Sequence, residues 1–233
     1  MFEGISHIIF DADDTLWVNE DNFQKFDSDF SELMSAYMPK EMASKELLET
    51  EKKNIPIYGF GGKSMMLSMI ETAARITGGQ GDLALAQRII GMGKALLQMP
   101  VVLLDGVDET LVGLSGKYQL VLATKGDITD QQRKIDASGL SRYFNDIEIM
   151  ADKKEKDYLD LFKRIGTPAD NCLMVGNSMM SDIVPALNVG AKAAYIPYHV
   201  TWQYEKHPQS ESGIESPNYV KLSSIEELTT ILQ

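Results

Sequence analysis

The chain has 233 residues, of which 44% are hydrophobic and 24% are charged, and its net charge at pH 7 is −12. This composition is typical of a globular protein with one large or two modest domains, and it excludes a wholly disordered, collagen-like or coiled-coil chain. The negative charge disfavours a nucleic acid polymer or an anionic membrane as partner. No apolar run reaches the roughly 18 residues that a transmembrane helix needs.

The N-terminal residues and the single cysteine bear on the cellular compartment. The N-terminus has no basic segment ahead of an apolar run, so it does not resemble a signal peptide. Cys172 is the only cysteine, and its apolar neighbours predict a buried thiol without a disulfide partner in the chain. These features predict a cytoplasmic protein.

The first predicted element is a buried strand at 7–10, where the sequence HIIF runs directly into acidic residues. From about 20 to 98 the pattern is helical, with almost no strand signal. One apolar helical face is formed by side chains that recur three and four residues apart: Phe23, Phe26, Phe30, Leu33 and Met34. Further helices are predicted at about 41–53, 64–77 and 82–98, with glycines between them.

After Pro100 short apolar runs alternate with helical segments. The predicted strands are 118–123, 147–150, 171–175 and 192–196. The predicted helices are 130–138, 155–165, 182–187 and 224–232, and 203–217 is predicted to be a surface loop. Strands that alternate with helices predict an α/β fold with a doubly wound parallel sheet, covered on both faces. We therefore predict a core domain from 1–18 and 100–233, with an all-helical domain inserted at 19–99.

Polar side chains follow the predicted strands at the points where they end. They come after 7–10, after 118–123, after 147–150 and after 171–175, and they are Asp11, Asp13, Thr15, Thr124, Lys125, Asp152, Lys153, Asn177 and Asp182. Ligands of open parallel sheets bind at the carboxyl ends of the strands, so we expect these side chains to converge.

Several carboxylates in one small site repel one another, and a hard divalent cation with oxygen ligands relieves that repulsion, which predicts Mg²⁺. With phosphate bound there, one aspartate can attack phosphorus and a second can protonate the leaving oxygen. A lysine can offset the charge of the nucleophile and of the transferred group, while a hydroxyl donates to the phosphoryl oxygens.

Four of these segments resemble the motifs of the haloacid dehalogenase-like superfamily, most of whose members are Mg²⁺-dependent phosphatases. The segments are Asp11-Ala-Asp13-Asp-Thr15-Leu, Thr124, the lysine ahead of the 155–165 helix, and Gly176-Asn177-Ser178-Met-Met-Ser-Asp182. The resemblance implies a Rossmann-like core at 1–18 and 100–233, with a helical C1-type cap at 19–99.

The resemblance also implies residue roles. Asp11 is the implied nucleophile and a metal ligand, and Asp13 is the implied general acid/base, with its backbone carbonyl on the metal. Thr15 supports the loop. Thr124 and Lys153 are the other implied catalytic residues. The candidate phosphate-binding residues are Thr15, Thr124, Lys125 and Lys153, although Lys125 also fits a packing role. Lys156 is the alternative motif lysine, and we prefer Lys153 because it lies nearer the strand end.

The fourth motif departs from the superfamily pattern, because Asn177 stands where an aspartate is usual. An amide oxygen can still coordinate Mg²⁺ but brings no charge, so Asn177 and Asp182 are the candidate metal ligands in this motif. A Pro-Tyr-His-x-Thr-Trp segment follows at 197–202, as in subgroups with Asn in the fourth motif. Packing and substrate contact both remain open for its His199 and Trp202.

These features predict a Mg²⁺-dependent phosphatase that hydrolyses a small phosphorylated metabolite. A dehalogenase is one alternative, but dehalogenases of this superfamily usually lack the second aspartate, so Asp13 favours phosphate chemistry. A phospho-receiver module is disfavoured by the helical insertion. A catalytically weak phosphate-binding relative is the third alternative, and it depends on Asn177. The sequence leaves the substrate and the oligomeric state open.

Overall fold

The computed structural model describes residues 2–206 and 214–232 and divides into two compact units. One unit comprises Met1–Val18, Val101–Lys125 and Gln131–Gln233, and the other comprises Asn19–Pro100 with Gly126–Asp130. Within the described ranges, no helix combines the length and apolar character needed to cross a membrane.

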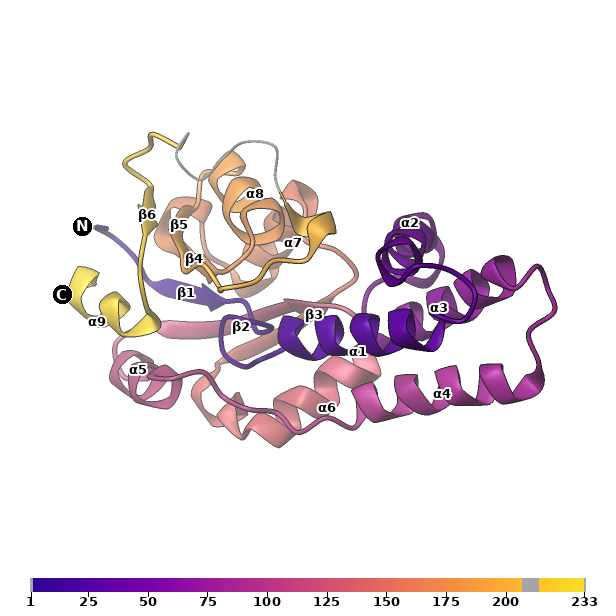
Figure 1. Ribbon diagram of the computed structural model, residues 1–233. Helices are drawn as coiled ribbons and strands as arrows, with labels where there is room; N and C mark the ends of the chain where they lie inside the picture. Colours follow the sequence, from indigo (N-terminus) through magenta and orange to yellow (C-terminus); the bar gives the residue numbers. More distant parts are fainter. Residues whose placement is uncertain (1, 207–213, 233) are drawn as a thin grey trace. The chain divides into compact units, whose positions relative to one another are not determined.

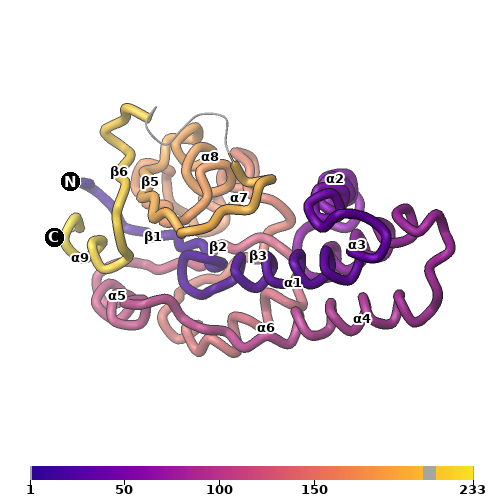
Figure 2. The backbone as a smooth tube through the Cα atoms, viewed as in Figure 1, coloured from indigo at the N-terminus to yellow at the C-terminus, as the bar shows by residue number. Residues whose placement is uncertain are grey.

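The first unit is built on a six-stranded, fully parallel sheet, which confirms the predicted fold class (Figure 1). Its strands are β1 (His7–Phe10), β2 (Gln119–Lys125), β3 (Asp146–Met150), β4 (Cys172–Gly176), β5 (Lys192–Tyr195) and β6 (Tyr219–Lys221). The spatial order is β3-β2-β1-β4-β5-β6, so the N-terminal strand, indigo in Figure 2, lies inside the sheet.

This strand order places a topological switch point at β1 and β4. The chain first extends the sheet from β1 toward β3, then returns to β4 on the other side of β1. Phe10 is level with Leu122 of β2 and with Val175 of β4. The loops after these three strands therefore begin side by side, which is where ligands of doubly wound sheets bind.

Two apolar layers cover the sheet, as the alternation of side chains in β1 requires. Ile8 and Phe10 belong to one cluster, which includes α5 (Val107–Ser115) and α9 (Leu228–Ile231). Ile9 belongs to the other, which includes α7 (Glu155–Ile165) and α8 (Val184–Asn188). The predicted buried position of Cys172 is confirmed there, since its side chain is fully buried.

Several elements differ from the sequence-based expectations. Helix α5 and strand β6 were not predicted. The expected helix at 182–187 is a π-helical turn at Met179–Ile183 followed by α8. The last helix begins as a 3₁₀ turn at Ile225–Glu227. Part of the expected loop at 203–217 is a 3₁₀ turn, Gln203–Glu205, while 207–213 lies outside the described residues.

The second unit contains four helices: α1 (Glu20–Leu33), α2 (Lys40–Tyr58), α3 (Gly62–Ile76) and α4 (Leu83–Leu97). Phe26, Phe30 and Met34 pack with Met65 and Met69 in its core. Helix α2 runs five residues beyond the predicted end and contains Pro56 in its last turn. The residues Gly126–Asp130, which group with this unit, include the first turn of α6 (Ile128–Ser138).

Candidate active site

A buried lysine joins two aspartates at the switch point of the sheet. The Nζ atom of Lys153 lies 2.5 Å from Oδ1 of Asp11 and 2.8 Å from Oδ1 of Asp182. Asp11 directly follows β1, Lys153 lies three residues past β3, and Asp182 lies in the turn after β4. The parallel register thus brings together three side chains that are far apart in the sequence.

Burial and the charges of the three side chains together set the pKa values of this triad. Burial and the nearby charge of Asp182 raise the pKa of Asp11 to about 7, although the ammonium of Lys153 acts in the opposite direction. Burial would lower the pKa of Lys153, but the charges of Asp11 and Asp182 outweigh it and raise that pKa above its usual value. Lys153 is therefore a permanent cation that only partly offsets two buried carboxylates.

Two threonine hydroxyls lie at the same edge. Thr15 donates to Oδ2 of Asp11 at 2.9 Å, and its hydroxyl also lies 3.4 Å from Oδ1 of Asn177. Thr124 is buried near the end of β2, where its hydroxyl accepts from Nε2 of Gln131 at 2.6 Å. The first-motif loop turns sharply enough that Asp14 adopts a φ of 62°, a value that aspartate tolerates better than most residues.

Asp13 has different surroundings from Asp11, and sequence reasoning missed them. Nζ of Lys134 lies 2.6 and 2.8 Å from its two carboxylate oxygens. Nε1 of Trp17 donates to Oδ1 at 2.6 Å, and Nε2 of Gln131 donates to Oδ2 at 3.1 Å. Gln131 and Lys134 lie three residues apart in α6. That spacing, directly after the Thr124 segment, is the signal that could have identified them.

Hydrogen bonds between side chains and backbone groups hold the fourth-motif loop, residues 176–182, in place. Oδ2 of Asp182 accepts from the backbone N–H of Ser178 at 2.9 Å. A Cβ added at Gly176 would overlap the carboxylate of Asp182, so glycine is needed there. Tyr158 in α7 donates to the carbonyl of Ser181 at 2.9 Å. This loop presents both of the predicted metal ligands of the motif.

The structure places Lys125 in a contact that the sequence did not reveal. Its ammonium pairs with the carboxylate of Glu205 and donates to Oγ of Ser181 at 2.7 Å. Burial alone would raise the pKa of Glu205, but the charge of Lys125 and hydrogen bonds from Lys125, Ser178 and Ser181 leave that pKa below its usual value. Glu205 lies just beyond the 197–202 segment, as an acid among aromatic residues, and sequence reasoning passed over it.

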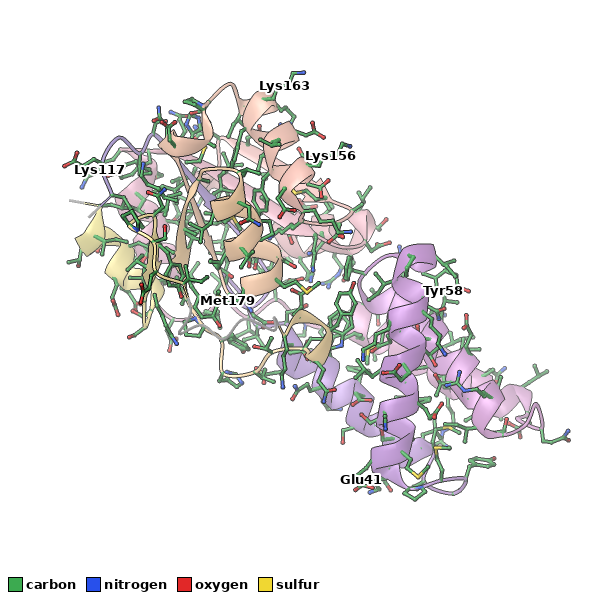
Figure 3. All side chains as sticks on the ribbon, turned by 90° about the horizontal axis from the view of Figure 1, so that it is seen from above. Glu41, Tyr58, Lys117, Lys156, Lys163 and Met179 are labelled. Carbon is green, nitrogen blue, oxygen red and sulfur yellow. The ribbon has the colours of Figure 1, made fainter. Side chains whose placement is uncertain are left out.

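The other candidate residues lie in separate environments. Lys156 projects from α7 with its side chain 86% exposed, and its ammonium lies 3.7 Å from a carboxylate oxygen of Asp160 (Figure 3). It does not join the Lys153 triad. The ring of His199 lies 4.2 Å from that of Tyr198, and the ring of Trp202 lies 4.9 Å from that of Tyr204. These contacts leave both roles open for His199 and Trp202.

The donor set at this edge fits a hard divalent cation. Among the residues that the structure describes, no three His, Cys, Asp or Glu side chains form a metal-binding group. The predicted ligands include only two such side chains, Asp11 and Asp182, together with the amide oxygen of Asn177 and the backbone carbonyl of Asp13. All are oxygens, which Mg²⁺ prefers. Lys153 supplies one positive charge against the two carboxylates of Asp11 and Asp182, so negative charge remains for a cation to offset.

The fold and this site define a doubly wound α/β protein with an acidic, lysine-containing centre at its switch point. The model of one family, haloacid dehalogenase-like hydrolase, matches residues 5–190. The chain therefore belongs to the haloacid dehalogenase-like hydrolases, which confirms the resemblance found in the sequence.

Individual relatives support this assignment. N-acylneuraminate-9-phosphatase from Mus musculus is 28% identical over 168 residues, and the Homo sapiens protein of that name is 27% identical. Both alignments cover 70% of this chain and 65% of the relative, so the chain spans a little less than two thirds of the length of these relatives.

Solved structures agree on the fold. A haloacid dehalogenase-like family hydrolase from Xanthomonas campestris has a TM-score of 0.88 and 34% identity, over 98% of this chain and 91% of that one. The putative HAD-hydrolase YfnB from Bacillus subtilis, solved bound to magnesium, has a TM-score of 0.64 and 19% identity, over 99% of both chains. The second likeness shows a shared fold alone.

Proposed function

We propose that this protein is a phosphatase that hydrolyses a small phosphomonoester, with Asp11 as nucleophile and Asp13 as general acid/base. The observation that carries the proposal is the pair of carboxylates two residues apart after β1. One is joined to buried Lys153, and the other lies in a more open setting. The N-acylneuraminate-9-phosphatase relatives support phosphate as the group transferred.

In the first half of the reaction, a carboxylate oxygen of Asp11 attacks phosphorus and the bond to the leaving oxygen breaks. Asp13 gives its proton to that oxygen, so that an alcohol departs. In the second half, Asp13 takes a proton from water, which attacks phosphorus and releases phosphate from Asp11. Lys153 holds Asp11 in place and offsets negative charge in both halves.

The remaining predicted site residues would bind the phosphoryl group or Mg²⁺. Thr124 would donate its hydroxyl hydrogen bond to a phosphoryl oxygen. A phosphate-binding role for Thr15 requires its single hydroxyl hydrogen to turn from Asp11 to the phosphoryl group. Mg²⁺ would be held by Asp11, Asp182, Asn177 and the Asp13 carbonyl, and when bound it supplies positive charge for the phosphoryl group. Asn177 would provide an oxygen without charge. A phosphate-binding role for Lys125 requires its ammonium to bind phosphate in competition with Glu205.

The helical unit is proposed to act as the substrate-selecting cap. We propose the core at 1–18 and 100–233 and the cap at 19–99, which would be of the C1 type. The support is its composition: four helices around their own apolar core, inserted into the chain between β1 and β2. N-acylneuraminate 9-phosphate is the first natural compound to test, since the named relatives act on that class.

The test is hydrolysis of p-nitrophenyl phosphate in Mg²⁺ and in EDTA, comparing wild type with Asp11→Asn. The variant keeps the shape of the side chain but loses the nucleophile, so turnover should fall by roughly a thousandfold or more. Asp136→Asn is the matched control, because Asp136 is an exposed acid of α6 whose carboxylate bonds Gln132.

Three results would contradict the proposal. Undiminished turnover in Asp11→Asn would exclude Asp11 as the nucleophile. Halide release from 2-chloropropionate, without hydrolysis of p-nitrophenyl phosphate or N-acylneuraminate 9-phosphate, would favour the dehalogenase alternative. Phosphate binding without turnover of either phosphoester would instead favour the catalytically weak relative.

A further inference from the structure

Glu205 lies at the centre of a polar network beside the fourth-motif loop. Its side chain is 11% exposed, and Oε2 accepts from the hydroxyls of Ser178 at 2.5 Å and Ser181 at 2.8 Å. Lys125 pairs with its Oε1 and also donates to Oγ of Ser181 at 2.7 Å. The network thus joins the end of β2, the 176–182 loop and the Gln203–Glu205 turn.

These contacts decide which way the two serine hydroxyls point. Each hydroxyl has one hydrogen, and both hydrogens are directed at Glu205. The oxygen of Ser178 is then left to accept the backbone N–H of Ser181 at 3.0 Å, which caps the turn that carries Asp182. An amide in place of this carboxylate has one acceptor oxygen, so the two hydroxyls and the ammonium of Lys125 could not all keep their contacts.

The same turn presents the proposed metal ligands. The backbone N–H of Ser178 holds Oδ2 of Asp182, and Asn177 is the residue before Ser178. Asp182 is 1% exposed, so its carboxylate cannot reorient freely. Glu205 is therefore linked to Asp182 through Ser178, whose hydroxyl donates to Glu205 and whose backbone N–H donates to Asp182.

We propose that Glu205 and Lys125 form a positioning pair, which holds the 176–182 loop so that Asp182 and Asn177 bind a divalent cation. The inference rests on the proposed function, because it takes these two residues as Mg²⁺ ligands. It assigns Lys125 a different role from the phosphate binding expected from the sequence. The charge of Lys125 balances Glu205, so that a carboxylate can be placed beside an already acidic site.

The experiment measures Mg²⁺ binding directly, by titration calorimetry with MgCl₂ and no substrate. Glu205→Gln should weaken Mg²⁺ binding about tenfold, since groups that orient metal ligands typically have effects of this size. Lys125→Met should weaken it to a similar extent. The double variant should bind Mg²⁺ no more weakly than the single variant with the lower affinity, because the two residues act through one network. Glu148→Gln is the matched control, since Glu148 also pairs with a cation, Arg164, in another part of the unit.

A kinetic measurement separates positioning from general damage. In Glu205→Gln the Mg²⁺ concentration for half-maximal rate should rise about tenfold, in line with binding. The rate at saturating Mg²⁺ should stay within about twofold of wild type, since the cation restores the loop geometry. A lower rate at saturating Mg²⁺ with unchanged Mg²⁺ affinity would overturn the inference. So would a Lys125→Met variant that raises only the KM for the phosphoester.

The failure of this inference can be told from the failure of the proposed function. Wild type that binds Mg²⁺ and hydrolyses phosphoester, with Glu205→Gln and Glu148→Gln indistinguishable, overturns the inference alone. Wild type that does neither overturns both. If Glu205→Gln does not fold, Ser181→Ala removes one hydroxyl of the same network, and unchanged Mg²⁺ affinity in that variant would also count against the inference.

Discussion

Asp11 and Asp13 lie two residues apart in one loop, yet each is paired with a lysine in a different setting. Around Asp11, the side chain of Lys153 is 1% exposed and also bonds Asp182. Around Asp13, the carboxylate is 23% exposed and has Lys134 as its own cation. The first pair is a buried triad with an excess of negative charge, and the second is a balanced pair at the edge of solvent.

This difference is suited to a division of labour. A nucleophile must stay in one position and must not exchange protons with solvent during attack, which the buried triad provides. An acid/base must exchange protons with the leaving group and with water, which a partly exposed carboxylate can do. Neighbouring aspartates therefore gain distinct roles from their surroundings, as the sequence alone does not show.

The largest expected effect comes from Lys153→Met. Removing one partner of a buried ion pair leaves uncompensated charge, and here two carboxylates lose the same cation. The free energy of unfolding should fall by about 3–5 kcal/mol in EDTA at pH 8. The ammonium of Lys153 acts to lower the pKa of Asp11, which burial and Asp182 raise to about 7, so this pKa should be higher still in the variant. A carboxyl whose pKa is raised on folding costs stability as pH rises from its unfolded pKa to its folded pKa, and the variant loses more over that range. The loss should therefore be larger at pH 8 than at pH 5, as urea unfolding would measure.

Lys156→Met is the matched control for this variant, because Lys156 is an exposed lysine of α7. It should change the free energy of unfolding by less than about 0.5 kcal/mol at either pH. If the two lysine variants were equally stable, Lys153 would not be the buried cation that the structure describes.

The sheet and the Lys153 triad could largely be predicted from the sequence. Short apolar runs identify buried strands, and parallel strands place their following residues at one edge, so Asp11, Lys153 and Asp182 were expected to meet. Helix 155–165 was also predicted with its observed ends. These features depend on local patterns and on one rule about parallel sheets.

The partners of Asp13 and Lys125 could not be predicted in this way. Lys134 reaches Asp13 from α6, and Glu205 reaches Lys125 from a turn 80 residues further along the chain. Such contacts depend on how helices and loops pack on the sheet, which residue spacing does not determine. Strand β6 was missed because it is three residues long, with too short an apolar run to identify.

A smaller effect on stability is expected from Thr15→Val, which tests the hydrogen bond to the second carboxylate oxygen of Asp11. Valine keeps the shape but removes the hydroxyl that donates to Oδ2 of Asp11. Because a buried carboxylate oxygen then lacks a donor, the free energy of unfolding should fall by about 1–2 kcal/mol. Thr15→Ser retains the hydroxyl, so its free energy of unfolding should be close to that of wild type. Equal stability of the two variants would show that this hydrogen bond does not support Asp11.

The smallest expected change in stability, under about 1 kcal/mol, is that of Lys134→Met, because Asp13 keeps two other donors and contact with water. Its effect should appear in turnover. Without Lys134 the carboxylate of Asp13 has more than one favourable orientation, so kcat should fall about tenfold, while KM should not change because Asp13 does not hold the substrate. Lys134→Arg keeps the charge and should recover part of kcat. A destabilisation as large as that of Lys153→Met would show that the two lysine–aspartate pairs are equivalent, and the contrast between them would then have to be abandoned.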